Sequence, residues 1–244
     1  SNGRYDTLQN YGTITGNINN NNGTITNLFN TNSGTIGGNI DNSNGIIENF
    51  ENSGTIVGNI TNSLGNITID NKESGFIGGI ITSNGGITNI SNSANGNIGV
   101  ITNNANSTTN IQSWNVGDAS NPNNPIKVAG DNLGGINTGT IYINAIAGRE
   151  YTISDIVEGS NGNFDSSGNS YASQLNGGKG ESSIVDSLRG VADIYSFTHV
   201  GKDKYSVGLD TRELSGKTLG ASLIYSSRMR QIDTNNMLRE INVK

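Results

Sequence analysis

The sequence predicts an all-β protein that begins as a parallel β-helix with coils of about 21 residues. In the first hundred residues nine glycines recur at spacings of 9 to 11 residues, and each is followed two positions later by isoleucine. The units alternate between two types, so the true repeat is the pair, which recurs after 22, 20, 21 and 21 residues. The glycines that open the units are Gly12, Gly23, Gly34, Gly45, Gly54, Gly65, Gly75, Gly85 and Gly96. A short fixed period predicts one small unit stacked on itself, and therefore a scaffold without a pocket.

Each unit is predicted to contain short β-strands. The apolar segments are five to seven residues long, too short for stable helices, and they are rich in isoleucine and threonine. In Thr13-Ile14-Thr15 the alternation points the isoleucine inward and the threonines outward. The Asn-Gly and Ser-Gly pairs between segments accept positive φ angles. We therefore expect two internal stacks, Ile14, Ile36, Ile56, Ile77 and Ile98 in one, and Ile25, Ile47, Ile67 and Ile87 in the other.

The composition is dominated by residues that favour turns. Asparagine occurs 42 times, glycine 35 times and proline twice, and only 14% of the residues are charged. Such a composition is typical of disorder, but each aligned isoleucine contributes about 1.5–3 kcal/mol when buried, which favours a folded stack. Asparagines at matching turn positions are predicted to form side-chain amide ladders along the stack. Turn chemistry explains the asparagines, and a ligand-binding asparagine face is the alternative.

Charge and hydropathy exclude several classes of protein. The net charge is −6, and Arg4 and Lys72 are the only basic residues before position 110, so we expect no nucleic-acid partner. The sequence contains no stretch of about 18 apolar residues, so we expect no membrane-spanning helix. The absence of cysteine excludes a disulfide framework. We expect Ser1 and Asn2 to be foreign residues, and because the repeat begins abruptly we expect the sequence to be a piece of a longer protein.

The character of the chain changes near residue 107, which predicts three parts: regular β-helix repeats in residues 1–107, an irregular β end or cap in 108–215, and a helical segment in 216–244. Residues 159–180 are polar and predict an exposed loop. The strand-like runs of the second part are residues 110–116, 126–128, 140–143, 151–153, 191–197 and 204–209. Its large side chains Trp114, Tyr142, Tyr195 and Phe197 suit a cap over the solenoid end.

The third part predicts one or two short helices. Asp233 or Thr234 is a plausible N-cap before the apolar pair Met237 and Leu238.

Two segments resemble a known family. Asn-Ser-Gly-Thr-Ile-Val-Gly-Asn-Ile (residues 52–60) is similar to the repeats of bacterial autotransporter passenger domains of the Helicobacter and Campylobacter type. Residues 206–210, 216–224 and 228–239 resemble the segment just before the outer-membrane β-barrel of these proteins, a sharper match. The resemblance covers nearly the whole chain. It implies a right-handed parallel β-helix, an autochaperone-like cap, and a linker toward a β-barrel that is missing from this sequence.

Few residues of the sequence suggest a catalytic or metal-binding site. His199 lies near Asp193 and Asp203, but no serine stands in a nucleophile elbow. Asp131 lies in a Gly-Asp-Asn-Leu-Gly-Gly run that faintly resembles a calcium repeat and is more simply a turn.

Glu48 and Asp70 are 22 residues apart, so one face of the β-helix is able to hold both as a hydrolytic pair. Stacked like charges also arise by chance. We therefore predict no catalytic, cofactor-binding or metal site, and no enzymatic activity for this chain.

Three functional classes remain open. The first is a non-catalytic stem of a surface-displayed passenger, anchored through its own C-terminal outer-membrane barrel. The second is an adhesin whose β-helix flank binds the host cell surface or a copy of itself. The third is the stem of a subtilisin-like protease or a vacuolating-toxin-like protein with its active part upstream. An ice-binding threonine rank begins at Thr13/Thr15 and Thr24/Thr26 but is interrupted at Gly37 and Glu48.

Overall fold

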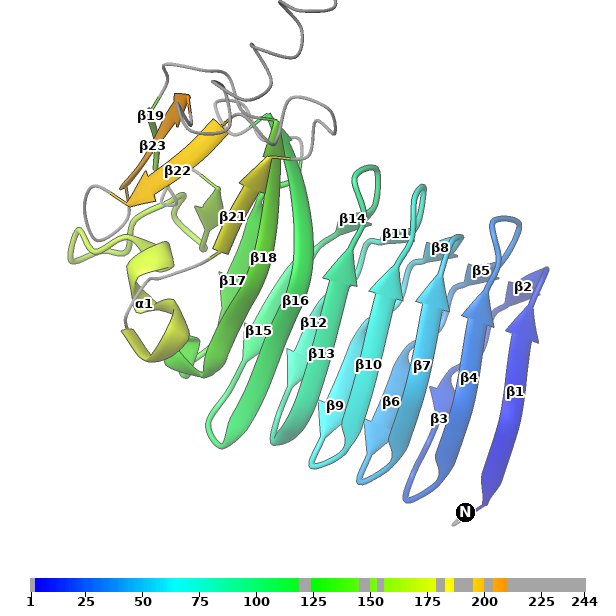
Figure 1. Ribbon diagram of the computed structural model, residues 1–244. Helices are drawn as coiled ribbons and strands as arrows, with labels where there is room; N and C mark the ends of the chain where they lie inside the picture. The colour runs from blue at the N-terminus through cyan, green and yellow to red at the C-terminus, as the bar shows by residue number, and fades with distance from the viewer. Residues whose placement is uncertain are drawn as a thin grey trace, which may run out of the picture.

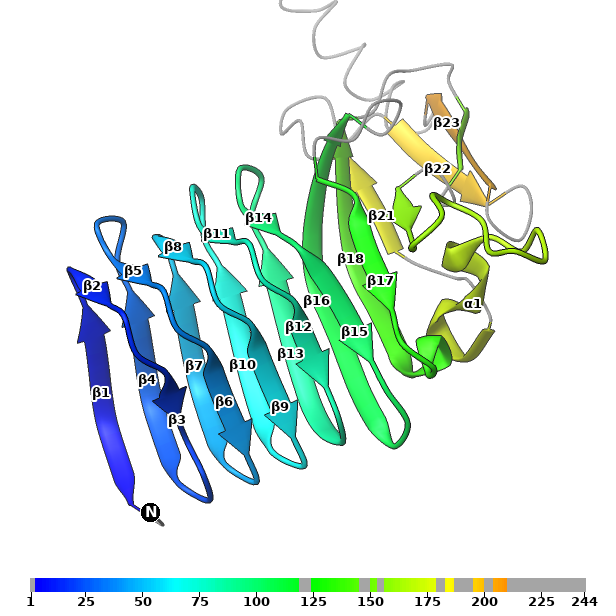
Figure 2. The ribbon, with the colours of Figure 1, turned by 180° about the vertical axis from the view of Figure 1, so that it is seen from behind.

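Each coil of the repeat region contributes one strand to each side of a three-sided solenoid (Figures 1 and 2). The computed structural model describes residues 3–118, 124–144, 150–152, 156–178, 183–186, 195–199 and 204–209. The chain winds as a right-handed parallel β-helix of about five turns with about 21 residues per coil, as the sequence predicts. The helical segment expected in residues 216–244 lies outside the described residues.

Sheet A is the longest side and runs from one end of the solenoid to the other. Its eight strands are parallel and lie in chain order, because each coil places its strand beside that of the previous coil. The strands are β1 (Arg4–Asn10), β4 (Thr24–Asn30), β7 (Ile46–Asn52), β10 (Asn66–Asn71), β13 (Gly86–Asn92), β16 (Ser107–Asp118), β18 (Ile136–Asn144) and β21 (Ser183–Asp186).

Sheets B and C form the other two sides. Sheet B contains β2 (Thr13–Ile14), β5 (Thr35–Ile36), β8 (Thr55–Ile56), β11 (Phe76–Ile77) and β14 (Asn97–Ile98). Sheet C contains β3 (Ile18–Asn19), β6 (Ile40–Ser43), β9 (Ile60–Ser63), β12 (Ile81–Ser83), β15 (Val100–Asn103), β17 (Ile126–Ala129) and β20 (Val157–Glu158). Sheets A and C therefore continue past residue 107 in the same parallel arrangement, while β14 is the last strand of sheet B among the described residues.

The first predicted isoleucine stack is confirmed. It lies in sheet B, where Ile14, Ile36, Ile56, Ile77 and Ile98 are aligned strand by strand. All but Ile14, in the first coil, are buried. The inner faces of sheets A and C add further apolar rows, so every coil buries several side chains against its neighbours.

The second predicted stack is correct for three members and wrong for Ile87. Ile25, Ile47 and Ile67 are aligned inside sheet A, but the next buried position belongs to Thr88. Ile87 instead faces outward with 44% of its surface exposed.

The cause lies in the two consecutive glycines before Ile87. Gly85 and Gly86 both have positive φ angles, 99° and 74°. Gly86, and not Gly85, approaches Gly65 of the previous coil, and a Cβ there would lie 1.9 Å from the Gly65 carbonyl oxygen. The repeat glycine is therefore one position later than its spacing suggests. A shift of one residue turns every following side chain of the strand to the other face.

Two ladders of asparagine run inside the solenoid, which confirms the predicted amide stacking and places it away from solvent. Each Nδ2 donates to the Oδ1 of the aligned asparagine in the next coil at 2.8–2.9 Å. The first ladder contains Asn10, Asn30, Asn52, Asn71 and Asn92, and the second contains Asn20, Asn42 and Asn62. These asparagines are buried and also donate to backbone carbonyls of the next coil, so they form no ligand-binding face.

The second ladder ends in a buried hydroxyl network at the position of the misplaced glycine. Asn62 Nδ2 donates to Thr88 Oγ1 at 3.1 Å, and Ser83 Oγ donates to the same oxygen at 2.7 Å. Ser83 Oγ also lies 3.0 Å from Thr109 Oγ1, which donates to Asn103 Oδ1. The register shift that carries Thr88 inward is therefore matched by serine in place of asparagine at position 83.

Each turn from sheet C to sheet A between β3 and β18 has a positive φ at one or two residues. Asparagine or glycine takes this conformation in the other turns, but Leu64 has φ 62° and is 68% exposed. A side chain with a Cβ loses about 1–2 kcal/mol in this conformation, and asparagine tolerates it better. Leu64→Asn is therefore expected to stabilise the protein by roughly 0.5–1 kcal/mol in urea unfolding.

The neighbouring coil offers the reverse substitution as a control. Asn44 has φ 57° at the equivalent turn and is exposed. Asn44→Leu is expected to lower the free energy of unfolding by a similar amount. A stabilising Asn44→Leu, or a destabilising Leu64→Asn, would contradict the strain argument.

The C-terminal side of the described chain carries an irregular cap. Sheet D is antiparallel and contains β19 (Glu150–Thr152), β23 (Lys204–Leu209) and β22 (Tyr195–His199) in that order. Trp114 occupies the position after Asn92 in the first ladder, is fully buried, and donates from Nε1 to the Asn124 carbonyl at 2.9 Å. Tyr142 is partly exposed, and the side chains of Tyr195 and Phe197 lie outside the described residues.

The expectation of an exposed loop in residues 159–180 is wrong in its second half. Helix α1 (Tyr171–Gly178) packs beside the 3₁₀ turn η1 (Leu133–Gly135) and β18. Ala172 and Leu175 are buried against the end of the solenoid, which gives this polar stretch an apolar attachment. The helix contains one regular turn, since Leu175, Asn176 and Gly177 have non-helical angles.

Candidate functional site

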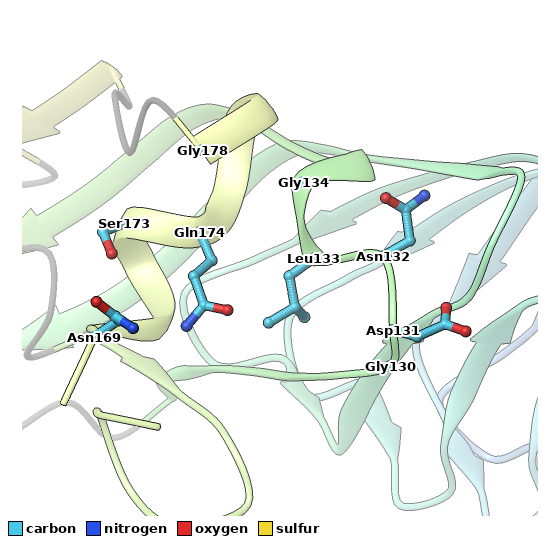
Figure 3. A pocket seen from close by; sticks show the side chains of 9 residues that line it. All are labelled: Gly130, Asp131, Asn132, Leu133, Gly134, Asn169, Ser173, Gln174 and Gly178. Atoms are coloured by element: carbon cyan, nitrogen blue, oxygen red, sulfur yellow. The ribbon is translucent and has the colours of Figure 1, made fainter. Parts of the chain in front are cut away.

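A polar hollow lies between η1 and α1 at the end of the solenoid (Figure 3). It is lined by Gly130, Asp131, Asn132, Leu133, Gly134, Asn169, Ser173, Gln174 and Gly178. In Figure 3, Gln174 and Leu133 extend from the two facing elements, while the Asp131 side chain points away from α1.

The η1 side of the hollow is fixed by the last coil. Asn103 Nδ2 donates to the Asn132 carbonyl at 2.7 Å, and Asn132 Nδ2 donates to the Ser107 carbonyl at 3.0 Å. The Asn132 backbone N–H in turn donates to the Asn103 carbonyl. The loop is thus attached to the same edge that carries the internal ladders.

The α1 side is organised by Asp165. Its Oδ1 accepts hydrogen bonds from the backbone N–H groups of Ser167 and Asn169, both at 2.9 Å. Its Oδ2 accepts from Gln174 Nε2 at 3.0 Å, which ties the helix to the turn. The backbone donor of Asn169 is the main reason that the pKa of Asp165 lies below its usual value.

Acid is expected to loosen this turn. Because the pKa of Asp165 is lower in the folded than in the unfolded chain, its contribution is present above the unfolded value and is lost as pH falls through the folded value. Amide NMR shifts of Ser167 and Asn169 should therefore hold at neutral pH and change below the usual carboxyl value of 3.8.

Two variants make the assignment specific. Asp165→Asn should abolish this acid transition, whereas Asp131→Asn should leave it unchanged. A transition that survives Asp165→Asn would show that another group controls the turn.

The hollow offers mainly hydrogen-bond acceptors. The amide nitrogens of Asn132, Asn169 and Gln174 already donate within the protein, and Ser173 Oγ donates to the Ser170 carbonyl at 2.7 Å. Within the described part of the chain no three histidine, cysteine or carboxylate side chains gather as metal ligands do. Asp131, the residue of the calcium-like run, lines the hollow beside neutral side chains.

A second hollow lies on the outer face of sheet A. It is lined by Gln9, Phe29, Asn30, Thr31, Asn32, Glu51 and Ser53. Glu51 aligns with Phe29 on one side and with Asp70 on the other. An aromatic ring beside carboxylates favours polar or cationic groups over apolar ligands.

Glu48 and Asp70, which their spacing allows to stack as a pair, are not aligned in the structure. Asp70 aligns with Glu51, because β7 holds one more residue than β10 between the aligned pairs Ile47/Ile67 and Phe50/Ile69. Asp70 instead bonds to Lys72 Nζ, and this hydrogen bond is the main cause that raises the pKa of Lys72. Asp70 is therefore occupied as an ion pair.

The remaining residues singled out from the sequence come into no described constellation. The backbone of His199 lies in β22 opposite Tyr205, while Asp193 and Asp203 lie outside the described residues. Sequence reasoning missed Asp165 and Gln174. The Asp-Ser-Ser-Gly-Asn run at 165–169 is a turn signal, but nothing in it indicates the distant loop at 130–134.

Comparison with known proteins identifies no relative of this chain. No family model matches the chain, and neither a curated protein nor a solved structure matches it. Among the described residues, no helix has the length and apolar character needed to cross a membrane.

Proposed function

We propose that this chain is the non-catalytic stem of a surface-displayed autotransporter passenger. The observation that carries the proposal is sheet A, whose eight parallel strands run the length of the solenoid in unbroken chain order. An axial stack of this kind holds a distal segment away from its attachment point, because each coil contacts only its neighbours and adds the same rise.

The composition of the chain is consistent with passage to the cell surface through an outer-membrane barrel. A passenger of this type crosses its barrel unfolded, and a chain with no cysteine carries no disulfide to block that passage. The core consists of repeated isoleucine and asparagine rows that form coil by coil. The irregular cap with buried Trp114 suits a C-terminal folding nucleus.

Surface display tests the proposal. The chain fused ahead of an autotransporter outer-membrane barrel is expected to reach the surface of intact cells and to resist added protease as one folded fragment. A fusion without the barrel is the control and should remain inside. A fusion with the barrel that accumulates in the periplasm would reject the stem function.

A second candidate function is adhesion through the flank. Thr61, Thr82 and Thr102 are aligned on the outer face of sheet C in three successive coils. Such shallow repeated positions give weak contacts that gain strength by number, with the host surface or a second copy as partner. Cell binding by the whole chain that is lost in a Thr61→Ala/Thr82→Ala/Thr102→Ala variant would support adhesion. Unchanged binding would reject this face.

A further inference from the structure

The solenoid contains five Asn-x-Ser/Thr tripeptides, the acceptor pattern for N-linked sugars. They begin at Asn22, Asn59, Asn66, Asn89 and Asn106. The tripeptide alone does not distinguish a sugar acceptor from a chance occurrence, because asparagine and threonine are abundant in every coil. The structure separates the five by the position and the hydrogen bonds of each side-chain amide.

Three of the five lie on one edge, at the turn from sheet C to sheet A. Asn22 and Asn106 are exposed residues of these turns with φ angles of 57° and 64°, and Asn66 is the exposed first residue of β10. Asn22 lies in the turn before β4, Asn66 in β10, and Asn106 in the turn before β16. These three strands are every second strand of sheet A. The three amides are therefore about 10 Å apart along the axis, twice the strand spacing of ~4.8 Å.

The other two amides are held by neighbouring coils. Asn59 Oδ1 accepts the backbone N–H of Ile80 at 2.9 Å, at the opposite corner between sheets B and C. Asn89 lies in the middle of β13, where Nδ2 donates to Thr68 Oγ1 at 3.3 Å and Oδ1 accepts from Asn110 Nδ2 at 2.9 Å. Sugar transfer requires the amide to turn out toward an enzyme, and these bonds oppose that rotation.

The surroundings of Asn66 give an independent reason for a sugar at this edge. Its aligned neighbours on both sides are Ile46 and Ile87, which are 40% and 44% exposed. Two apolar side chains flanking a polar one on an outer sheet face are an exposed patch without a partner in the described chain. The first sugar of a glycan at Asn66 would lie over both isoleucines and cover them with its apolar ring face.

We propose that Asn22, Asn66 and Asn106 are N-glycan acceptors in the folded protein, and that Asn59 and Asn89 are not. In the transfer, Nδ2 forms a bond to the anomeric carbon of a pyrophosphate-activated sugar. The bond from that carbon to the phosphate oxygen breaks, and the pyrophosphate group leaves with the electron pair. Nδ2 loses one proton to the base of the transferase.

Site occupancy by peptide mass spectrometry tests the proposal on the whole folded chain. One arm supplies UDP-glucose with a soluble sequon-specific glucosyltransferase, and the other supplies a lipid-pyrophosphate oligosaccharide with an oligosaccharyltransferase, so that the labelled arm identifies the donor. Asn59-Ile-Thr and Asn66-Ile-Thr are identical tripeptides and form a matched pair. Relative to unstructured peptides of the five sites, labelling should persist at the three edge sites and fall about tenfold at Asn59 and Asn89, where hydrogen bonds must break first. Equal labelling of Asn59 and Asn66, or no edge labelling in either arm, would overturn the proposal.

One substitution should move the label between sites. Thr68→Val removes the hydroxyl that Asn66 needs in its tripeptide and also removes the acceptor of Asn89 Nδ2. We expect label to disappear from Asn66 and to rise at Asn89, while Thr68→Ser keeps the original pattern. Loss at Asn66 without a gain at Asn89 would show that the bond from Asn89 Nδ2 to Thr68 does not protect Asn89, and would overturn that part of the assignment.

Discussion

Replacing Ile56 with aspartate is expected to cost about 4 kcal/mol or more, because an unpaired charge enters a dry apolar stack. Ile56 is fully buried and lies between Ile36 and Ile77 of the adjacent coils. The carboxylate has no aligned donor, so both neighbouring coils must open to admit water. We expect the coils around β8 to lose protection in amide hydrogen exchange and the whole repeat region to unfold at lower urea.

The next residue is a matched control. Val57 is 59% exposed on the outer face of the same coil, so Val57→Asp should change the free energy of unfolding by less than about 0.5 kcal/mol. Hydrogen exchange is the better measurement, since an array of repeats need not unfold in one step. Similar losses for both variants would contradict the internal position of the Ile56 stack.

Replacing Asn52 with alanine is expected to cost about 2–4 kcal/mol, although the side chain is polar. Asn52 is fully buried in the middle of the first ladder, where Oδ1 accepts from Asn30 and Nδ2 donates to Asn71, both at 2.8 Å. Alanine leaves the Asn71 oxygen without this donor and opens a cavity. Asn32→Ala, at an exposed position of the adjoining turn, should be nearly neutral in the same urea titration.

Asn52→Asp separates the hydrogen bond from the volume. The ionised carboxylate has the right size but donates nothing to Asn71 Oδ1, and burial raises its pKa relative to the unfolded chain. The destabilisation should therefore be complete above the folded pKa and should disappear as pH falls through the unfolded value, where the protonated acid again donates. A pH-independent loss would show that the amide matters only by its shape.

The sequence predicts the coil, the parallel pairing and the sheet B stack, because each rests on a glycine and an isoleucine at constant spacing. It does not predict the position of Ile87, since Gly85 and Gly86 both satisfy the pattern and only contact with Gly65 distinguishes them. The supposed pair of Glu48 and Asp70 fails for a related reason: one extra residue in β7 changes the alignment.

The site near η1 is out of reach of sequence reasoning for a different cause. Leu133 and Gln174 line one hollow through the stacking of the last coils, and the turn organised by Asp165 is attached by buried Ala172 and Leu175. A segment with only two apolar anchors carries no periodic signal.

The internal amide ladders give the solenoid an electrical direction. In both ladders the N–H groups point toward the C-terminal coils and the oxygens toward the N-terminal coils, and bonds to backbone carbonyls such as Thr55 O fix that orientation. The amide dipoles therefore add head to tail, while on the outer face Asn110 and Asn137 donate in the opposite sense. Two such solenoids meeting through their first coils would oppose the oxygens of Asn10 and Asn20 to their own copies. At the other end the ladders stop inside the solenoid, at Trp114 and at the Thr88 hydroxyl, so the side chains themselves distinguish the two ends of the rod.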